Sequence, residues 1–307
     1  MYDRKFKLIA LDIDGTLITG QNTLTKRTKK ALRDAMDKGF IVTIATGRFY
    51  PSACRIARKL PVNAPIVCND GALIKDVFSD NTIYFKPLPL KLALEILELV
   101  SRFPTLKARA FMEHHQIYAG ENLQKWQFLS YFKFHRKRSL LGLWNYVRDF
   151  VLVPVKNAGD IYGLMDILKK PPAKIFVTGE GKHIEEFSRQ ITTLYNEEIF
   201  LTSALKNCVD IIHGEVSKAK GLSILAESLG IKREEIIAFG DNINDINMLE
   251  YAGLGVAMAN APRRVREIAD HVTASNNEDG IAVFLEQFLQ TGIIPDKSTP
   301  GAVNIPF

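Results

Sequence analysis

The sequence predicts an α/β fold, a doubly wound parallel sheet with an α+β domain inserted into it. Residues 1–75 alternate apolar strands with helices, and the same alternation returns from residue 215 onward. The segment between them is richer in aromatic residues and in mixed strands. We therefore expect the two outer stretches to share one Rossmann-like sheet, with the core at residues 1–84 and 214–307 and the inserted domain at residues 85–213.

The first half of the predicted core begins with KFKLIALDID, a nearly continuous apolar run that ends in acids. Such a run is typical of a strand buried on both faces of a parallel sheet. A helix follows from Thr25 to Lys38, with Gly39 in the position that ends it. The next predicted elements are a strand at residues 40–48, a helix at residues 50–60 and a strand at residues 64–72.

The second half of the core repeats this order of elements. Strands joined through helices in this way are parallel, and their crossovers are expected to be right-handed. The carboxyl ends of the strands should then meet at one edge of the sheet. The predicted elements are a helix at residues 216–230, a strand at 235–241, a helix at 244–253, a strand at 254–259 and a closing helix at 279–289.

The inserted segment has a less regular pattern, for which an α+β domain is the simplest explanation. It carries amphipathic helices at residues 90–100 and 183–195. The tail at residues 295–307 is predicted to be loop or disorder. The expected strands of the insertion lie in TIYFKPL, LKARAFMEHHQIYAG, AKIFVTGE, EIFLTSAL and CVDIIHGE.

Composition narrows the class of protein. No apolar run approaches the roughly 20 residues that a bilayer requires, and the N-terminus lacks a signal-peptide pattern, so we expect a soluble, unexported protein. Three widely spaced cysteines argue against a disulfide framework or a zinc site and favour a reducing cytoplasm. The net charge of +6 favours anionic ligands and leaves phosphorylated metabolites and nucleic acid both open.

Two acids follow the first predicted strand in the motif LDIDGTL. A spacing of two in extended chain directs the carboxylates of Asp12 and Asp14 to the same side. Ligands of open α/β sheets bind beyond the carboxyl ends of the strands, and Gly15 permits the sharp exit that exposes the acids. Two acids in such a place repel each other unless a cation neutralises them. An acid pair alone is as compatible with a structural turn as with a site.

Further polar clusters end two other predicted strands. The residues TGR close the second strand, and GDNINDINML places Asp241, Asn244 and Asp245 after a later one. A lysine-bearing helix, VSKAKGL, precedes that later strand. Because the carboxyl ends of parallel strands lie at one edge of a sheet, these clusters should converge with the acid pair.

The four motifs LDIDGTL, ATGR, VSKAKGL and GDNINDINML resemble, in order and spacing, those of the haloacid dehalogenase superfamily. Within it, the sequence is similar to the Cof-like hydrolases, whose inserted C2-type cap lies between the second and third motifs. The closing segments LGVAMANA and HVTASNNEDGIAVFL are similar as well, so the resemblance covers nearly the whole chain. It implies a phosphatase that uses Mg²⁺ and forms an aspartyl-phosphate.

Residue by residue, the resemblance makes Asp12 the nucleophile and Asp14 the acid that protonates the departing oxygen and then activates water. Related transport ATPases carry threonine in place of Asp14, so its presence favours hydrolysis. The resemblance assigns Mg²⁺ to Asp12, the Asp14 backbone carbonyl and Asp241, with Asp245 as a support for the metal. The positions implied for phosphate or substrate contact are Ile13, Thr46, Gly47, Arg48, Asn69 and Asn244.

Two of these assignments stay open. The third-motif lysine, which balances negative charge, is Lys218 in one alignment and Lys220 in another. We prefer Lys218, although helical spacing does not decide between them. The run CNDGA resembles the family's CNGA with Asp70 inserted or substituted, which leaves Asn69 between a substrate contact and a turn residue.

The predicted reaction is hydrolysis of small phosphomonoesters, with sugar phosphates, flavin mononucleotide and pyridoxal phosphate as candidate substrates and with the cap setting the choice. The alternatives are a phosphate-ligand sensor, a phosphomutase and a nucleic-acid-binding protein that uses KFHRKR at residues 133–138. We interpret that run first as a solvated cap segment, and we expect neither a nucleic-acid nor a membrane partner. His114, His115 and Cys68 receive no metal or catalytic role.

Overall fold

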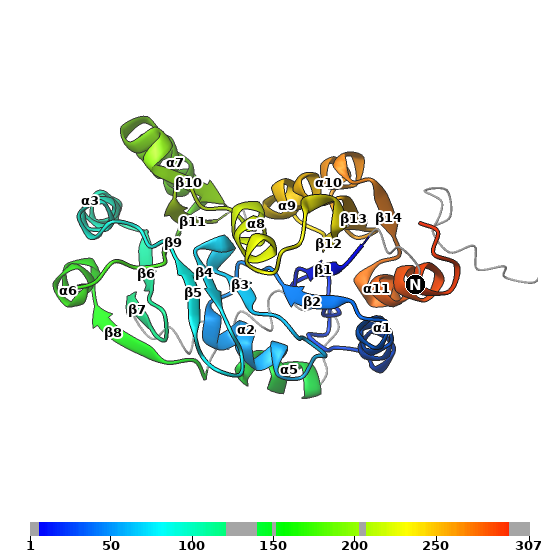
Figure 1. The fold of residues 1–307 in the computed structure, drawn as a ribbon. Coiled ribbons are helices and arrows are strands. Elements are labelled where there is room, and N and C mark those ends of the chain that lie inside the picture. Colours follow the sequence, from blue (N-terminus) through cyan, green and yellow to red (C-terminus); the bar gives the residue numbers. More distant parts are fainter. Residues whose placement is uncertain (1–5, 121–139, 149–151, 203–206, 295–307) are drawn as a thin grey trace, which may run out of the picture.

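The computed structural model describes residues 6–120, 140–148, 152–202 and 207–294, which form two packed units (Figure 1). The larger unit holds a five-stranded sheet in the order β14-β13-β12-β1-β2, and every neighbouring pair in it is parallel. The predicted doubly wound core is therefore confirmed. Its strands are β1 (Leu8–Leu11), β2 (Ile41–Ile44), β12 (Ile236–Gly240), β13 (Leu254–Met258) and β14 (His271–Thr273).

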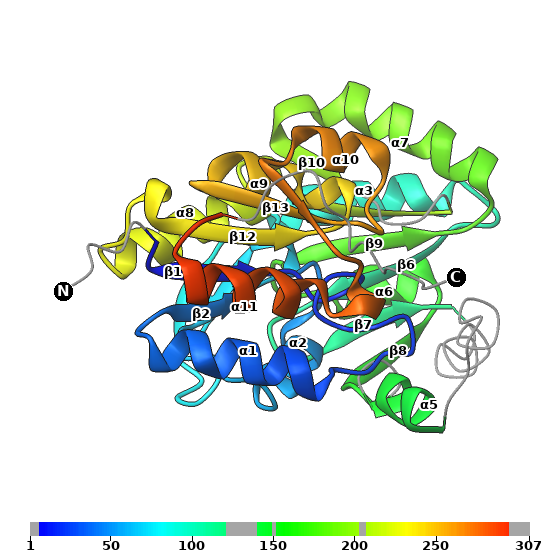
Figure 2. The same cartoon turned by 90° about the vertical axis from the view of Figure 1, so that its right-hand side faces the viewer.

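Helices cover both faces of the core sheet, which is why β1 had to be apolar throughout. Ile9 and Leu11 belong to the apolar cluster on one face, whereas Leu8 and Ala10 belong to the cluster on the other. Figures 1 and 2 show the resulting layers, with α1 beside α11. The first face is covered by α1 (Lys26–Asp37), α2 (Tyr50–Ala57) and α11 (Gly280–Thr291), and the second by α8 (Lys218–Ser228), α9 (Ile246–Tyr251) and α10 (Arg263–Ile268).

The expected boundaries of the first helix are confirmed in detail. Thr25 caps α1, since its Oγ1 accepts a hydrogen bond from the Thr28 N–H at 3.0 Å. Beyond the helix, Gly39 has a φ of +84°, a conformation that glycine adopts without a steric penalty. The capping threonine and the terminating glycine thus act as the sequence indicated.

A three-stranded antiparallel sheet continues the core beyond β2. It comprises β3 (Ile66–Cys68), β4 (Leu73–Lys75) and β5 (Thr82–Phe85). A parallel bridge between Ala45 and Val67 joins it to β2. We expected TIYFKPL among the strands of the insertion, but its strand β5 pairs with β4 instead. The two strands are consecutive and joined by a short turn, which favours their pairing with each other.

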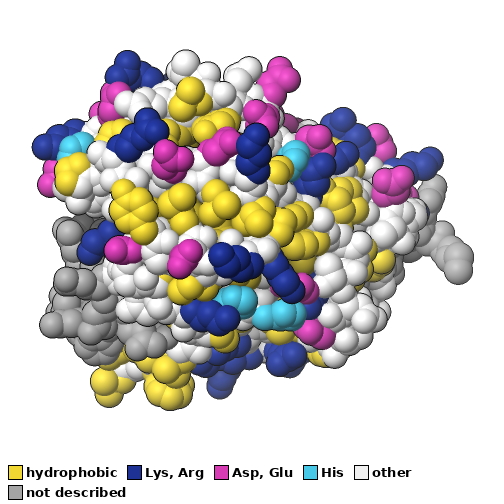
Figure 3. Space-filling model, turned by 90° about the vertical axis from the view of Figure 1, so that its left-hand side faces the viewer, with side chains coloured by type: hydrophobic (Ala, Val, Ile, Leu, Met, Phe, Trp, Pro, Cys, Tyr) yellow, Lys and Arg dark blue, Asp and Glu magenta, His cyan; other side chains and the backbone are white. Residues whose placement is uncertain are grey.

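The smaller unit, which we call the cap, is a six-stranded mixed sheet in the order β10-β11-β9-β6-β7-β8. Its outer face packs against three helices, and Figure 3 shows a band of apolar side chains across that side of the molecule. The strands are β6 (Lys107–Phe111), β7 (Gln116–Ala119), β8 (Val155–Gly159), β9 (Lys174–Thr178), β10 (Ile199–Thr202) and β11 (Cys208–His213). The helices are α3 (Leu90–Ser101), α6 (Ile161–Ile167) and α7 (Gly181–Tyr195). A further helix, α5 (Leu140–Tyr146), is linked to α2 through Arg55, which donates to the carbonyl oxygen of Arg148 just beyond α5.

The chain passes between the two units twice, between β5 and α3 and between β11 and α8. We propose the division into residues 1–84 and 214–307 for the core and 85–213 for the cap on this basis. Within the described ranges, no helix combines the length and the apolarity needed to cross a bilayer. The basic run at residues 133–138 and the tail at residues 295–307 lie outside the described residues.

Glycine allows α8 to approach the sheet closely. Gly71 has a φ of +107°, and a Cβ there would lie 2.1 Å from the carbonyl oxygen of Ser217. A Cβ on Gly221 would lie 2.6 Å from Cγ1 of Val67. Because neither contact leaves room for a methyl group, the two glycines bring the first turn of α8, with Lys218, to the strand ends.

Gly71→Ala is expected to lower the free energy of unfolding by about 3 kcal/mol or more, because it adds a backbone clash to a strained φ. Gly230 also has a positive φ, +66°, but apart from its own atoms and its two chain neighbours no described atom lies within 4 Å of its Cβ position. Gly230→Ala should therefore cost only about 1 kcal/mol. Urea denaturation of both variants measures the difference, and equal costs would contradict the close approach of α8.

Candidate active site

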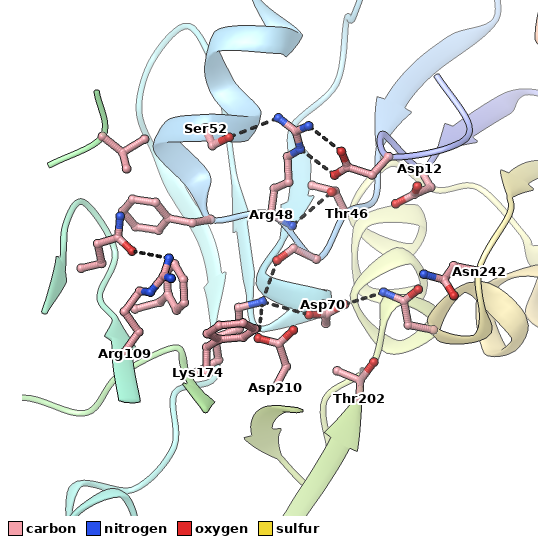
Figure 4. Close-up of a pocket in the computed structure, with 18 of the residues that line it drawn as sticks. Asp12, Thr46, Arg48, Ser52, Asp70, Arg109, Lys174, Thr202, Asp210 and Asn242 are labelled. Carbon is pink, nitrogen blue, oxygen red and sulfur yellow. Dashed lines mark hydrogen bonds and ion pairs between the residues drawn. The ribbon is translucent and has the colours of Figure 1, made fainter. Parts of the chain in front are cut away.

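A cavity of about 290 Å³ lies between the carboxyl ends of the core strands and the inner face of the cap (Figure 4). Alternate residues of the cap strands point to opposite faces of the sheet. Ala108, Ile175 and Val209 pack under the cap helices. The residue that follows each of them in its strand, Arg109, Phe176 and Asp210, faces the cavity. The lining includes Asp12, Asp14, Thr46, Gly47, Arg48, Asp70 and Asn244 from the core and Arg109, Phe111, Lys174, Phe176, Thr202 and Asp210 from the cap.

Lys218 joins the first motif to the fourth. Its Nζ lies 2.6 Å from Oδ1 of Asp12 and 2.6 Å from Oδ1 of Asp245, and all three side chains are buried. Burial disfavours the ammonium, but the two carboxylates outweigh burial and raise the pKa of Lys218 above its ordinary value. Lys220 is exposed. Of the two candidate lysines, Lys218 is the one that reaches the acids.

Three acids form a cluster beside this lysine. Carboxylate oxygens of Asp12, Asp241 and Asp245 lie within 4.8 Å of one another. Burial, followed by the charge of Asp245, raises the pKa of Asp241 to about 7. Burial and the neighbouring carboxylates also raise the pKa of Asp12 well above its ordinary value, against the effect of Lys218. One ammonium leaves this set of oxygen donors negatively charged, which fits a hard divalent cation such as Mg²⁺.

The carboxylate of Asp245 is occupied by its own loop. Its Oδ2 accepts hydrogen bonds from the backbone N–H groups of Asp241 (3.0 Å) and Asn242 (2.9 Å), while Oδ1 accepts from Lys218. Asp241 is held from the other side by Thr16, whose hydroxyl donates to its Oδ1 at 2.9 Å. Asp245 therefore holds the loop at residues 241–245 and the Lys218 side chain in place. Asp12 and Asp241 are better placed than Asp245 to contact a metal.

Asp14 lies at the cavity mouth in a two-point contact with Arg48. Nε of Arg48 donates to Oδ2 of Asp14 at 2.6 Å, and Nη2 of Arg48 donates to Oδ1 at 2.5 Å. The arginine is buried and the Asp14 side chain is half-exposed. Ser52 accepts from the remaining guanidinium nitrogen at 3.3 Å. The sequence indicated a role for each residue but not their pairing, which depends on where the two strand ends meet.

The predicted phosphate contacts fall into two groups. Thr46, Gly47, Arg48 and Asn244 line the same cavity as Asp12. Ile13 and Asn69 do not: the Ile13 side chain packs in the apolar core, and Asn69 is fully buried. Neither amide atom of Asn69 has a hydrogen-bond partner within the part of the chain that the structure describes.

A second buried charge cluster, which the sequence did not reveal, connects the cap to the core. Nζ of Lys174 lies 2.9 Å from Asp210, 3.3 Å from Asp70 and 2.8 Å from the carbonyl oxygen of Gly47. Asp70 also accepts a hydrogen bond from Asn244 at 3.0 Å. Burial opposes the charge on Lys174, but the two carboxylates raise its pKa. A lysine and an aspartate on otherwise apolar strands were the available signal, since buried charges require partners.

Residues 9–285 match the family model for haloacid dehalogenase-like hydrolases. The chain is 30% identical over 284 residues to a 5-amino-6-(5-phospho-D-ribitylamino)uracil phosphatase of Bacillus subtilis, an alignment that covers 92% of this chain and 97% of the relative. It is 27% identical over 294 residues to a pyridoxal phosphate phosphatase of Escherichia coli, with 92% and 98% covered. A solved haloacid dehalogenase-like hydrolase from B. subtilis matches with a TM-score of 0.80 at 25% identity, over 92% of this chain and 99% of that one.

Mg²⁺ is expected to stabilise the protein by about 2.7 kcal/mol at about 100 times its Kd. Asp241→Asn should abolish this gain and should stabilise the metal-free protein at pH 8, because it removes an ionised carboxylate from the cluster. Thermal unfolding in EDTA and in MgCl₂ measures both effects. Asp166→Asn, which changes an exposed aspartate of α6, is the matched control. A native melting temperature that does not respond to Mg²⁺ would contradict the assignment.

Lys218→Met is expected to lower the free energy of unfolding by about 3 kcal/mol, because it leaves Asp12 and Asp245 buried without their cation. Lys220→Met, two residues away on the same helix, should change it by less than about 0.5 kcal/mol. Urea denaturation in EDTA compares the two variants. Similar losses from both would mean that Lys218 is not the residue that neutralises the acids.

Proposed function

This chain belongs to the haloacid dehalogenase-like hydrolases and is a phosphatase, and we propose that it hydrolyses small phosphomonoesters through an aspartyl-phosphate on Asp12. The observation that carries the proposal is the buried contact of Asp12 with Lys218, beside Asp241, at the end of a cavity that the cap covers. A carboxylate, a lysine and oxygen ligands for a cation meet the requirements of phosphoryl transfer.

In the proposed reaction, a carboxylate oxygen of Asp12 attacks phosphorus and the bond to the ester oxygen breaks. The hydrogen bond from Lys218 to Oδ1 orients the carboxylate and places positive charge beside the reacting phosphate. Asp14 gives a proton to the departing oxygen and then takes one from the water that hydrolyses the aspartyl-phosphate. Inorganic phosphate leaves and Asp12 returns to its starting form.

The donor set fits Mg²⁺, because every candidate ligand offers oxygen and the carboxylates repel one another without a cation. We propose that Asp12, the Asp14 backbone carbonyl and Asp241 hold the ion. When bound, it supplies positive charge that stabilises the phosphoryl oxygens. Asp245 supports this set by accepting from the Asp241 N–H.

The contact between Arg48 and Asp14 has a consequence for the acid step. Both oxygens of Asp14 accept hydrogen bonds from Arg48, so proton donation requires the arginine to release at least one of them. A guanidinium matches two phosphate oxygens as well as it matches a carboxylate. We therefore propose that the incoming phosphate draws Arg48 away and frees Asp14 when substrate is present.

The remaining phosphate contacts are proposed from their positions. Thr46 and the Gly47 N–H lie at the end of β2 on the cavity, and Ile13 could contribute only its backbone, since its side chain is in the core. Asn244 lines the same cavity and donates a hydrogen bond to Asp70. For Asn69, burial away from the cavity supports the role of a turn residue over that of a substrate contact.

The proposed substrates are sugar phosphates or cofactor phosphates such as flavin mononucleotide and pyridoxal phosphate. The names of the two relatives, one for a phosphorylated ribitylaminouracil and one for pyridoxal phosphate, support this range. A cytoplasmic location is proposed with it, supported by Cys54, Cys68 and Cys208, which are buried and unbridged.

Asp12→Asn should lower kcat at least about 1,000-fold, because the amide cannot replace the nucleophile. The measurement is release of inorganic phosphate from p-nitrophenyl phosphate and a panel of phosphorylated metabolites, with MgCl₂ and with EDTA. Asp166→Asn serves as the matched control, and the native protein should lose turnover in EDTA. Substantial turnover by a folded Asp12→Asn protein would refute the proposed nucleophile.

A further inference from the structure

The cap end of the cavity contains a buried arginine that forms no ion pair among the described residues. Arg109 of β6 is 8% exposed and lines the cavity on the side away from Asp12 (Figure 4). Within the part of the chain that the structure describes, its Nε has no hydrogen-bond partner, and its one hydrogen bond, to Oε1 of Gln116, is 3.5 Å long. Asp210 faces the same cavity but pairs with Lys174. Burial lowers the pKa of Arg109 to about 10, so the side chain stays charged at neutral pH.

Aromatic rings surround the guanidinium. Its central carbon lies 5.2 Å from the ring centre of Phe176, 5.6 Å from that of Tyr118 and 5.9 Å from that of Phe111. The register of the sheet causes this, because Arg109 is the cross-strand partner of Tyr118 on β7 and of Phe176 on β9. Ring faces stabilise a cation without occupying its N–H groups. The rings thus hold the arginine in place and leave its N–H groups available to a ligand.

The rest of the cap end is mainly apolar. Phe49, Tyr146 and Val153 line it, and the rings of Phe49 and Phe111 lie 5.5 Å apart. A sugar hydroxyl that lay against these apolar side chains would lose hydrogen bonds to water without replacement, which is costly. A flat ring would instead bury its faces against these side chains. The cavity, about 290 Å³ in volume, suits one ring and its phosphate.

The charges at this end limit the polar group that a ring can carry. Lys174 already contacts both Asp70 and Asp210, so within the described residues Arg109 is the cation that remains available. A second phosphate would bring about two negative charges to one guanidinium, near those two carboxylates. A single oxygen acceptor, neutral or singly charged, matches the free donors without this repulsion.

We propose that Arg109 is a specificity residue that selects phosphomonoesters whose leaving group is a flat conjugated ring bearing an oxygen acceptor, such as a carbonyl or an ionised hydroxyl. This inference rests on the proposed phosphatase reaction at Asp12 and assigns the substrate class of that site. Arg109 binds the oxygen acceptor attached to the ring, the aromatic side chains cover the ring, and the phosphate lies at the Asp12 end of the cavity.

The test compares kcat/KM for three esters. Pyridoxine 5′-phosphate has an aromatic ring that bears an ionisable hydroxyl, benzyl phosphate has an aromatic ring of similar shape without that hydroxyl, and glucose 6-phosphate has no aromatic ring. The native protein should prefer them in that order. Arg109→Met should lower the ratio of kcat/KM for pyridoxine 5′-phosphate to that for benzyl phosphate by roughly 10- to 100-fold, the range for a lost hydrogen bond to a charged group.

Two further variants keep the test decisive. Arg109→Lys retains the charge but loses the planar fork, so it should give an intermediate ratio even if Arg109→Met folds poorly. Arg102→Met, which removes an exposed arginine directly after α3, should leave the ratio unchanged. An unchanged ratio in both Arg109 variants, or a native preference for glucose 6-phosphate, would overturn the proposal.

A binding measurement separates this inference from the reaction itself. Isothermal titration of Asp12→Asn with pyridoxine 5′-phosphate and with benzyl phosphate reads the same preference without turnover. Tighter binding of the pyridoxine ester, lost when Arg109→Met is added, supports the substrate class even if no ester is hydrolysed. Equal binding of the two esters, with hydrolysis intact, refutes the role of Arg109 and leaves the reaction at Asp12 standing.

Discussion

The contact of the Lys218 ammonium with Asp12 and Asp245 is the interaction on which the rest of the site depends. A buried ammonium or a buried carboxylate is costly without a partner of opposite charge. The fold is therefore stable only when the three side chains are in contact. Asp12 follows β1, Lys218 begins α8 and Asp245 ends the turn after β12. One three-way contact therefore fixes a strand end, a helix start and a loop relative to one another. Asp241, on the same loop, is brought beside Asp12 as a result.

The sequence predicted this part of the site because the topology of parallel strands does most of the positioning. Each motif follows an apolar strand, and the carboxyl ends of those strands lie at one edge. Helical spacing alone did not separate Lys218 from Lys220. The structure does, because Ser217 caps α8 by accepting from the Lys220 N–H, so that Lys218 starts the helix pointing toward the strand ends.

The cap could be predicted only as a domain of mixed strands. The order of its strands in the sheet differs from their order in the sequence. A local sequence pattern therefore does not predict that Lys174 of β9 forms ion pairs with Asp210 of β11 and with Asp70 of the core. For the same reason Arg109 was not recognised, although an arginine between two alanines on a buried strand is a signal once the alternation is known. The proposed function therefore assigns phosphate contact to the strand ends of the core and leaving-group contact to the cavity-facing residues of the cap.

The covalent step at Asp12 is the central claim, and trapping the acyl phosphate tests it most directly. The Asp14→Asn protein, in which hydrolysis of the intermediate should be slowed, would be mixed with p-nitrophenyl phosphate and MgCl₂, quenched in acid and treated with borohydride, which reduces an acyl phosphate to an alcohol. Peptide mass spectrometry should then find homoserine in place of Asp12, and only in the sample that contained the ester. An unmodified Asp12 in protein that has released a stoichiometric amount of nitrophenol, or a modification at another residue, would contradict the account.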